Sequence, residues 1–426
     1  MAQPAQQQQK ASNMTPHCEL THFAGFDWAG DHHDIIIVDT AGRVVADFQI
    51  DHTAAGWRAW GERVAAYPKL GIAIETSFGM VVEQLIDSGA TVFPVNPMSA
   101  RRFRERKSPS GTKTDRHDAW ALADALRTDG HAWRALGPKD PIIEELRILC
   151  RDEVALIEER TALINQLRQA LREYYPTALE AFEDWNALGA WAFVERFPNT
   201  QVLIQKGKRQ WEKFLHVHKL NRPQTYQKRL EIFAKAGEWK LNNGLVKAKS
   251  LYALSKIKQL RILTAQLEEY RRRIEELFAD HPDSGLFGSL PGAGPKIAPR
   301  LLSEIGSDRA LYEDASGLQC VAGTAPVSFQ SGKIRKAQMR RACNRNLRHT
   351  MHLFAYTSVE QCTWARSYYD ALREKGKSHA QALRCLGQRW LKIIWKMWQS
   401  KTPYNAELHL KNQIAHGSWI LQLQTT

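Results

Sequence analysis

The 426-residue chain contains no apolar run that approaches the roughly 18 consecutive residues of a membrane-spanning helix, and no signal peptide precedes the first predicted strand. Its six cysteines are scattered and form no C-x-x-C pair. This pattern is typical of reduced intracellular thiols and excludes a disulfide framework. We therefore expect a cytoplasmic protein without a membrane partner.

Nucleotide-binding motifs are also absent, and acidic residues are in the minority. Neither G-x-G-x-x-G nor G-x-x-x-x-G-K occurs where a nucleotide-binding fold would carry it. The 59 Lys and Arg residues outnumber the 45 Asp and Glu residues, and the resulting formal net charge of +14 favours a polyanionic partner. RNA-binding and membrane-surface proteins are often equally basic, so charge alone does not identify DNA.

Four carboxylates in the first 120 residues are the most informative feature that is present. Asp27 (in HFAGFDWAG) and Glu75 (in GIAIETSFG) each follow a short apolar run that predicts a strand. Asp115 and Asp118 (in KTDRHDAWALADAL) open a predicted helix three residues apart, and therefore lie on one face. Such a quartet suits Mg²⁺, which takes oxygen ligands and keeps waters for a phosphate substrate. The pattern predicts metal-assisted attack on a nucleic-acid phosphodiester.

The order of predicted elements in residues 21–135 indicates an α/β domain. Strands come first, with a turn at Ala41-Gly42, and alternating helices and strands follow, including a helix with Thr53 as its cap. Acids at the ends of the first and fourth strands match the order of the RNase H or RuvC-like fold. The rival, a doubly wound nucleotide-binding domain, lacks its phosphate-binding motif.

Other polar residues near the quartet are weaker candidates. Taken singly, each acid of the quartet has an ordinary explanation as a turn, cap or solvated residue. Asp31 lies past the first strand, and Asp124 lies off the face of the Asp-x-x-Asp pair, so neither is expected in the site. The nearby histidines lack Cys partners and zinc-site spacing, and no metal role is expected for His32, His33 or His117.

Residues 140–284 are predicted to form a coiled-coil or helical region with two apolar seams. One seam repeats every seven residues at Ile157, Ile164 and Leu171. The other steps by three and four through Leu260, Leu263, Leu267, Tyr270, Ile274 and Leu277. The seams predict a long antiparallel helical pair or a coiled-coil dimer contact, with an ordinary bundle as the alternative. Between them, residues 181–245 form a Trp-rich basic insert of unassigned function.

Residues 285–400 form a third predicted module, mainly α-helical, flanked by a polar tail at 401–426; a Gln-rich tail of residues 1–20 precedes the first strand. The module opens with PGAGPK, which contains Gly292, Gly294 and Lys296. This looks like a helix-hairpin-helix turn, in which glycine lets backbone N–H groups approach a phosphate. A purely structural helix–helix turn is the alternative.

Two basic runs are candidate nucleic-acid contacts. The first, before the Asp-x-x-Asp helix, includes Arg101, Arg102, Arg104 and Lys113. The second contains no acid and comprises Lys333, Arg335, Lys336, Arg340, Arg341, Arg345 and Arg348. Basic runs are often only solvated faces, but such residues also bind phosphates without reading sequence.

Five motifs in order, GFDWAGDHHD, IETS, KTDRHDA, PGAGP and QSG, resemble those of DEDD insertion-sequence transposases with a RuvC-like N-terminal domain, a family that includes bridge-RNA-guided recombinases. The resemblance covers residues 22–130 and 285–355. It implies a prokaryotic, nucleoid-associated recombinase that joins donor and target DNA, guided by a structured RNA transcribed from the element's flank. It also implies a homodimer or homotetramer, and Mg²⁺ bound by Asp27, Glu75, Asp115 and Asp118.

The resemblance further implies a nucleophilic serine at Ser331. Serine attack would store the bond energy as a phosphoserine that a 3′ hydroxyl can reverse without ATP. Residue type alone favours a Ser-Gly turn, and Ser328 is a local competitor that lacks the following glycine. One departure from the family pattern is Cys343-Asn344, where a Gly-Asn pair is usual.

Two other functions are compatible with the residues. A Mg²⁺-dependent nuclease or Holliday-junction resolvase would need the four carboxylates but not the serine. A non-catalytic nucleic-acid scaffold would need only the basic surface and the helices.

Overall fold

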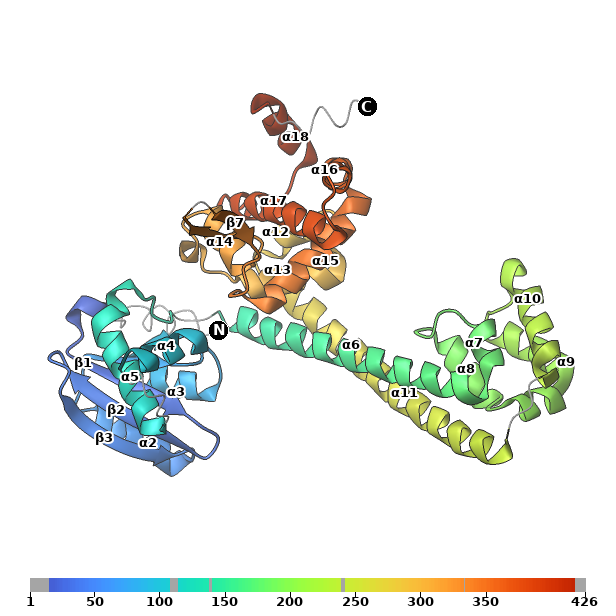
Figure 1. Cartoon of the computed structure of the whole chain (residues 1–426), viewed down its shortest axis with the longest axis horizontal. Coiled ribbons are helices and arrows are strands. Elements are labelled where there is room, and N and C mark those ends of the chain that lie inside the picture. The colour runs from blue at the N-terminus through green and yellow to red at the C-terminus, as the bar shows by residue number, and fades with distance from the viewer. Residues whose placement is uncertain (1–14, 108–113, 138–139, 239–241, 333, 418–426) are drawn as a thin grey trace. The chain divides into compact units, whose positions relative to one another are not determined.

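The structure, a computed structural model, describes residues 15–107, 114–137, 140–238, 242–332 and 334–417 (Figure 1). The chain divides into two compact units, residues 1–139 and 140–426, which are described separately. Within the described ranges, no helix is both long enough and apolar enough to cross a membrane.

A five-stranded mixed sheet forms the centre of the described part of the first unit, in the order β3-β2-β1-β4-β5. Strand β1 runs antiparallel to β2 and parallel to β4. The strands are β1 (His22–Trp28), β2 (His32–Asp39), β3 (Val44–Asp51), β4 (Leu70–Ile74) and β5 (Thr91–Pro94). The helices are η1 (His17–Glu19), α2 (Ala54–Val64), α3 (Met80–Asp87), α4 (Pro97–Lys107), α5 (Asp115–Asp129) and η2 (Gly130–Ala132). The expected α/β N-terminal domain is confirmed.

Helices cover both faces of this sheet. Successive strand residues point to opposite sides, and the strands carry apolar residues on each side that the helices bury. On one face, Phe26 and Ile72 pack with Trp60 of α2 and Leu85 of α3. On the other face, strand residues pack against α5 in a second cluster that includes Phe23, Ile36, Ala73, Leu122 and Leu126. All five residues of β4 are buried, as expected for a strand covered on both faces.

Helix α5 comes closest to the sheet at Gly25 of β1. A Cβ at this position would lie 1.8 Å from the backbone oxygen of Ala119 and 2.7 Å from the backbone nitrogen of Ala123, both on α5. Backbone atoms cannot move aside as the end of a flexible side chain can, so the contact requires glycine. It holds α5 beside the strand that carries Asp27.

The second unit is helical apart from one hairpin in its described part. Its first half contains α6 (Pro141–Tyr174), α7 (Pro176–Ala181), α8 (Leu188–Arg196), α9 (Thr200–Val217), α10 (Pro223–Ala234), η3 (Lys235–Glu238) and α11 (Asn243–Asp280). Its second half contains α12 (Ser284–Gly288), α13 (Gly294–Ile305), η4 (Arg309–Leu311), α14 (Ala315–Val321), β6 (Val327–Ser331), β7 (Ile334–Gln338), α15 (Arg345–Gln361), α16 (Thr363–Glu374), α17 (His379–Gln399) and α18 (Ala406–Ala415).

Helices α6 and α11 form the long antiparallel pair that the seams predict (Figure 1). Glu145 near the start of α6 pairs with Arg273 near the end of α11 at 2.7 Å, which fixes the antiparallel direction. The seam residues Leu171, Leu260 and Leu267 are fully buried within the chain. The seams are therefore occupied without a second copy, and a coiled-coil dimer contact stays a prediction.

The Trp-rich insert is a small core at one end of this helical pair. Trp185, Trp191 and Trp211 are buried, and each indole N–H donates to a backbone carbonyl nearby. These rings are packed side chains and cannot stack on nucleic-acid bases. Trp239 lies outside the described residues.

The PGAGP segment joins α12 to α13 and packs against α15. Gly292 has φ +84°, and a Cβ there would lie 2.9 Å from the backbone of Thr357. This contact gives Gly292 the structural role that was the alternative in the sequence. Gly294 and Lys296 are exposed, and phosphate binding by this turn stays a prediction.

Replacing Gly25 by alanine should force α5 away from β1. We expect a loss of at least about 1–3 kcal/mol in the free energy of unfolding, the usual cost of overpacking, measured by urea denaturation. Gly30→Ala is the matched control, since a Cβ at Gly30 has nothing within 4 Å. Equal stability of the two variants would contradict the close contact.

Candidate metal centre

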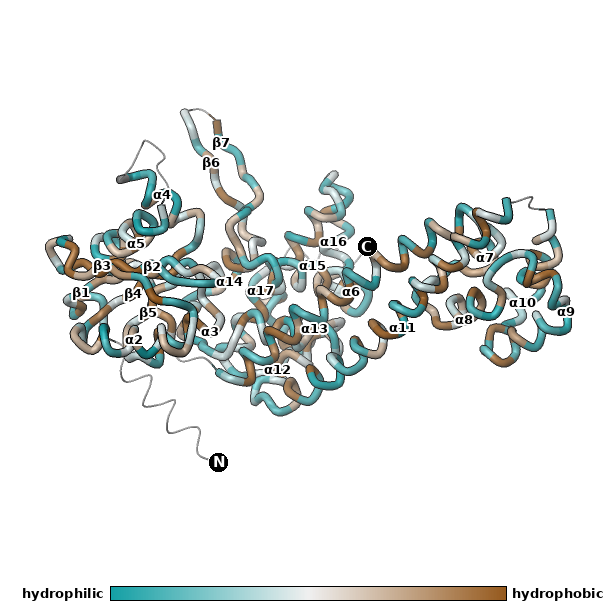
Figure 2. Tube along the Cα trace, turned by 90° about the horizontal axis from the view of Figure 1, so that it is seen from below, coloured by the Kyte–Doolittle hydropathy of each residue, from teal (hydrophilic) through white to brown (hydrophobic). Residues whose placement is uncertain are grey.

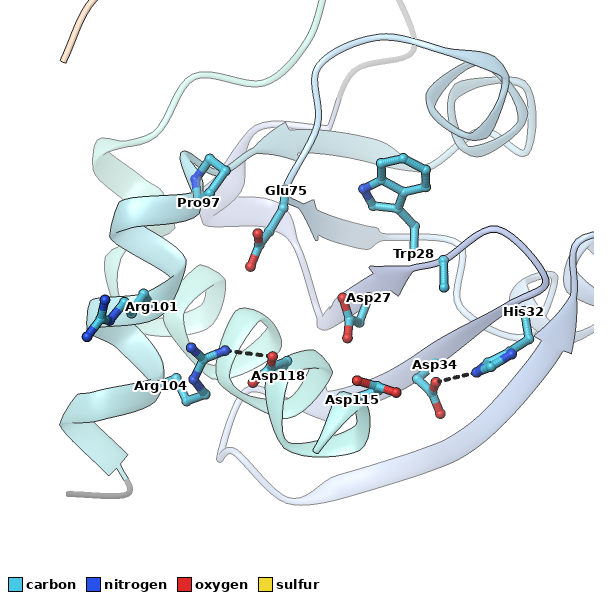
Figure 3. A pocket seen from close by; sticks show the side chains of 11 residues that line it. Asp27, Trp28, His32, Asp34, Glu75, Pro97, Arg101, Arg104, Asp115 and Asp118 are labelled. Atoms are coloured by element: carbon cyan, nitrogen blue, oxygen red, sulfur yellow. Dashed lines mark hydrogen bonds and ion pairs between the residues drawn. The ribbon is translucent and has the colours of Figure 1, made fainter. Parts of the chain in front are cut away.

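The four predicted carboxylates converge from three elements on one cleft. Asp27 directly follows Phe26, the last residue of β1 that pairs with β4, and Glu75 directly follows β4. Because β1 and β4 are parallel neighbours, both acids lie at the same edge of the sheet. Asp115 and Asp118 occupy the first turn of α5, which begins at the cap Thr114. All four side chains line a cleft of about 460 Å³ and face a common space (Figure 3).

The electrostatics of the cleft follow from this crowding of acids. Burial, followed by the neighbouring carboxylates of Asp118, Asp115, Glu75 and Asp34 in that order, raises the pKa of Asp27 from 3.8 to about 7. Like charges that share a site oppose ionisation unless a cation joins them. The cleft therefore favours a bound cation, because basic side chains of the protein neutralise only part of its negative charge.

Arg104 on α4 supplies that partial compensation. Its Nη1 donates to Oδ2 of Asp118 at 2.6 Å, and this hydrogen bond raises the pKa of Arg104. Asp118 is 7% exposed, and its second oxygen, Oδ1, is buried with no hydrogen-bond donor among the described residues. A buried carboxylate oxygen without a donor fits a ligand of a hard divalent cation.

Two residues that the sequence did not select also line the cleft. His32, Asp34 and Asp115 each offer a ligand atom, and these atoms lie within 4.8 Å of one another. His32 Nε2 lies 3.7 Å from Asp34 Oδ2. The sequence gives His32 no metal role, and the structure places its side chain in the lining of the cleft. Asp34 could have been identified only from the register of the β1–β2 pair, which places it directly opposite Asp27 on the neighbouring strand.

The remaining polar residues near the cleft have other partners or positions. His33 is fully buried and shares a 2.9 Å hydrogen bond with His52, and burial lowers its pKa to about 4. Asp124 pairs with Arg127 at 2.6 Å. His33, Asp124, Asp31 and His117 are all outside the lining of the cleft.

The first basic run contributes two side chains to the cleft. Arg101 and Arg104 line it, whereas Arg102 is exposed on α4 and lies outside the lining. Arg101 also pairs with Glu105 at 2.8 Å on the same helix. Lys113 lies outside the described residues.

Ser331 lies in the second unit, at the tip of the β6–β7 hairpin. It is the last residue of β6, is exposed, and precedes Gly332, whose φ of +55° makes the turn. Its hydroxyl has no hydrogen-bond partner among the described residues, which do not include the neighbouring Lys333. An unaided serine hydroxyl is a weak nucleophile, so serine chemistry at this position needs an activating group.

The second basic run divides into exposed and structural residues. Arg335 and Lys336 on β7, with Arg341 and Arg345, are exposed. Arg340 is half-buried and donates to the carbonyl of Ala325 at 3.4 Å. Arg348 is half-buried: it donates to the carbonyl of Arg340 and contacts Cys343 Sγ. Lys333 lies outside the described residues.

The unusual Cys343-Asn344 pair fits this structure. Asn344 caps α15, its side chain accepting from the N–H of Leu347 at 3.0 Å and donating to Glu304 at 2.6 Å. Cys343 lies beside Arg348 at the base of the hairpin. The departure from Gly-Asn therefore changes a packing contact and leaves the helix cap intact.

Replacing Asp27 by asparagine should stabilise the metal-free protein in a pH-dependent manner. The folded-state pKa of Asp27, about 7, exceeds its ordinary value of 3.8. Ionisation therefore destabilises the fold progressively from about pH 4 to pH 7, and by a constant amount above that. The gain in melting temperature of Asp27→Asn, measured in EDTA, should grow over this range and then level off.

Added Mg²⁺ or Mn²⁺ should stabilise the wild type and not Asp27→Asn, and should do so less at pH 5 than at pH 8 because the cation competes with a proton. Asp31→Asn, an exposed acid outside the cleft, is the control. A gain for Asp27→Asn that is independent of pH would contradict the clustering of charge.

Two family models match separate parts of the chain, and the first extends from the first unit into α6 of the second. Residues 24–176, which include the carboxylate cleft, match a transposase family with a DEDD domain typical of IS110, and residues 284–370 match the transposase family IS116/IS110/IS902. The putative transposase of the IS117 mini-circle from Streptomyces coelicolor is 30% identical over 91% of this chain and 96% of its own length.

Two further relatives are similar at comparable levels. An uncharacterized 43.6 kDa protein of insertion element IS110, also from Streptomyces coelicolor, is 28% identical over 91% of this chain and 96% of its own length. The putative transposase y4uE of Sinorhizobium fredii is 36% identical over 40% of this chain and 48% of its own length. The chain therefore belongs to the IS110/IS116 family of DEDD transposases, enzymes of insertion elements that act on DNA.

Proposed function

We propose that this transposase is an RNA-guided recombinase that cleaves and rejoins donor and target DNA with the carboxylate cleft and Ser331. The observation that carries the proposal is the convergence of Asp27, Glu75, Asp115 and Asp118 on one cleft from distant points of the sequence. An acid-lined cleft with a donorless buried oxygen is suited to a divalent cation, which we take to be Mg²⁺.

The four acids would hold Mg²⁺, which when bound neutralises phosphate charge and lowers the pKa of a coordinated hydroxyl. Arg101 and Arg104 line the same cleft and would orient a phosphate by charge-assisted hydrogen bonds. His32 and Asp34 would extend the ligand set or accept a proton at the cleft's edge. The RuvC-like fold of the first unit belongs to the same proposal and is supported by its sheet order.

In the covalent step, Oγ of Ser331 attacks the scissile phosphorus and forms a phosphoserine ester with the 5′ phosphate. The bond from phosphorus to the 3′ oxygen breaks, the hydroxyl proton passes to a carboxylate or water, and the departing 3′ oxygen takes up a proton. A 3′ hydroxyl of the other DNA then attacks the phosphoserine and releases Ser331, so no ATP is consumed.

The guide RNA is supported by the family resemblance and by the character of the basic surface. The exposed residues Arg335, Lys336 and Arg345 can bind phosphates of either nucleic acid but carry no pattern that reads bases. Specificity delegated to base pairing is the expected solution for such a surface. Exchange between two duplexes also needs more than one active site, which supports a dimer or tetramer.

A Mg²⁺-dependent resolvase that does not use Ser331 is the second candidate. It is favoured by one observation, the absence of any hydrogen-bond partner for the Ser331 hydroxyl among the described residues. The two mechanisms share the carboxylates and differ in whether a protein–DNA bond forms.

Replacing Asp118 by asparagine should abolish DNA cleavage, because it removes a charge from the cleft and the partner of Arg104. DNA and RNA binding, measured by gel shift, should persist. Asp129→Asn, on the same helix but paired with Arg106 at 3.2 Å outside the cleft, should cleave normally. Full cleavage by Asp118→Asn would remove the carboxylates from the mechanism of both candidates.

Ser331→Ala should abolish recombination and the covalent adduct while retaining metal and RNA binding, because the residue is exposed and its loss disturbs no packing. Denaturing electrophoresis of reactions on nicked, labelled DNA should show a slow, protease-sensitive band only with the wild type. Ser328→Ala, an exposed serine on the same strand, is the matched control. Guide-dependent strand transfer by Ser331→Ala at the wild-type rate would favour the resolvase.

A further inference from the structure

The β6–β7 hairpin leaves large apolar side chains about half exposed to solvent. Phe329 is 48% exposed, Ile334 51% and Val327 40%, and every residue of β6 and β7 is classed as exposed. Figure 2 shows the hairpin projecting from the helices of its unit, with hydrophobic positions along both strands. Large apolar side chains that stay exposed on a two-stranded ribbon do not stabilise it. Their exposure therefore indicates a surface that contacts a partner.

These apolar side chains all lie on the face that carries Ser331. Residues two apart on a strand share a face, which places Val327 and Phe329 with Ser331. Residues directly opposite each other also share a face, and Ile334 pairs with Ser331 while Lys336 pairs with Phe329. The other face carries Ser328, Gln330, Arg335 and Ala337, and is mainly polar.

The charge around the hairpin identifies the kind of partner. Residues 326–348 contain no Asp or Glu. In the described part of the chain, Arg335, Lys336 and Arg345 are exposed and join no ion pair with a carboxylate. A protein partner would have to supply acidic side chains to compensate this charge. Duplex DNA offers phosphates to the Arg and Lys side chains and stacked base pairs to the apolar side chains. We therefore take DNA as the occupant.

We propose that the Ser331 face of the hairpin enters duplex DNA and that Phe329 inserts between base pairs near the phosphate that Ser331 attacks. Two residues along a strand span about 7 Å, which is about two base-pair steps of 3.4 Å. Apolar wedges of this type unstack a step and kink the duplex. Phe329 is then a positioning residue that bends the backbone toward the serine, an inference that rests on the proposed function.

The test uses the full-length protein with its guide RNA and a duplex of the element end that carries 2-aminopurine at successive positions around the cleavage site. Binding should raise 2-aminopurine fluorescence at one step, and equally in the Ser331→Ala protein, where no reaction follows. Phe329→Ala should lose this rise and slow cleavage by at least about tenfold, which corresponds to 1.4 kcal/mol of lost stacking. Phe329→Leu should retain part of both.

Cleavage by Phe329→Ala should recover on a substrate in which that step already contains a mismatch, since the wedge is then no longer needed. Gln330→Ala, an exposed change on the opposite face, is the matched control and should behave as wild type. Because Phe329 is exposed, its replacement should leave the melting temperature unchanged.

Fluorescence that does not depend on Phe329, or cleavage that the mismatch does not rescue, would overturn the proposal. A changed oligomeric mass of Phe329→Ala with unchanged fluorescence would instead assign this face to a contact between protein subunits. Failure of the serine mechanism is seen separately, as cleavage by Ser331→Ala, because the fluorescence measurement needs no reaction.

Discussion

The contact of the α5 backbone with the β1 backbone at Gly25 is the constraint on which the candidate centre depends. It brings a helix to within van der Waals distance of a strand without intervening side chains. Asp27 lies two residues beyond this contact on β1, and Asp118 lies at the residue next to Ala119 on α5. A wider separation would divide the carboxylates into two groups too far apart for one cation.

The fold tolerates this cluster of acids by partial neutralisation. Proton uptake by Asp27 and the hydrogen bond from Arg104 to Asp118 both reduce repulsion in the metal-free protein. Under the proposed function, cation binding would displace the proton of Asp27 and would release Arg104 to bind a phosphate. Both effects lower the repulsion among the acids without removing the negative charge that favours a bound cation.

Much of this centre is predictable from sequence because acids that follow apolar strands lie at a common sheet edge, as Asp27 and Glu75 do. Asp34 was not predicted, because its position depends on the register of the β1–β2 hairpin, which no local residue reveals. The β6–β7 hairpin was missed for a different reason. Strands are recognised by a buried apolar face, and Phe329 and Ile334 face solvent. The helical pair was predicted because its seam is buried.

The antiparallel pair of α6 and α11 also sets a length. Helix α6 has 34 residues and is therefore about 50 Å long. Its first turns, including Leu146, belong to the core around α13 and α15, and its last turns, including Leu171, belong to the tryptophan-rich core. Because one continuous helix belongs to both cores, the length of that helix fixes the distance between them. Leu146 and Leu171 are 25 residues apart (171 − 146), or about 38 Å, so a duplex that contacted both cores would do so about 11 base pairs apart, close to one helical turn.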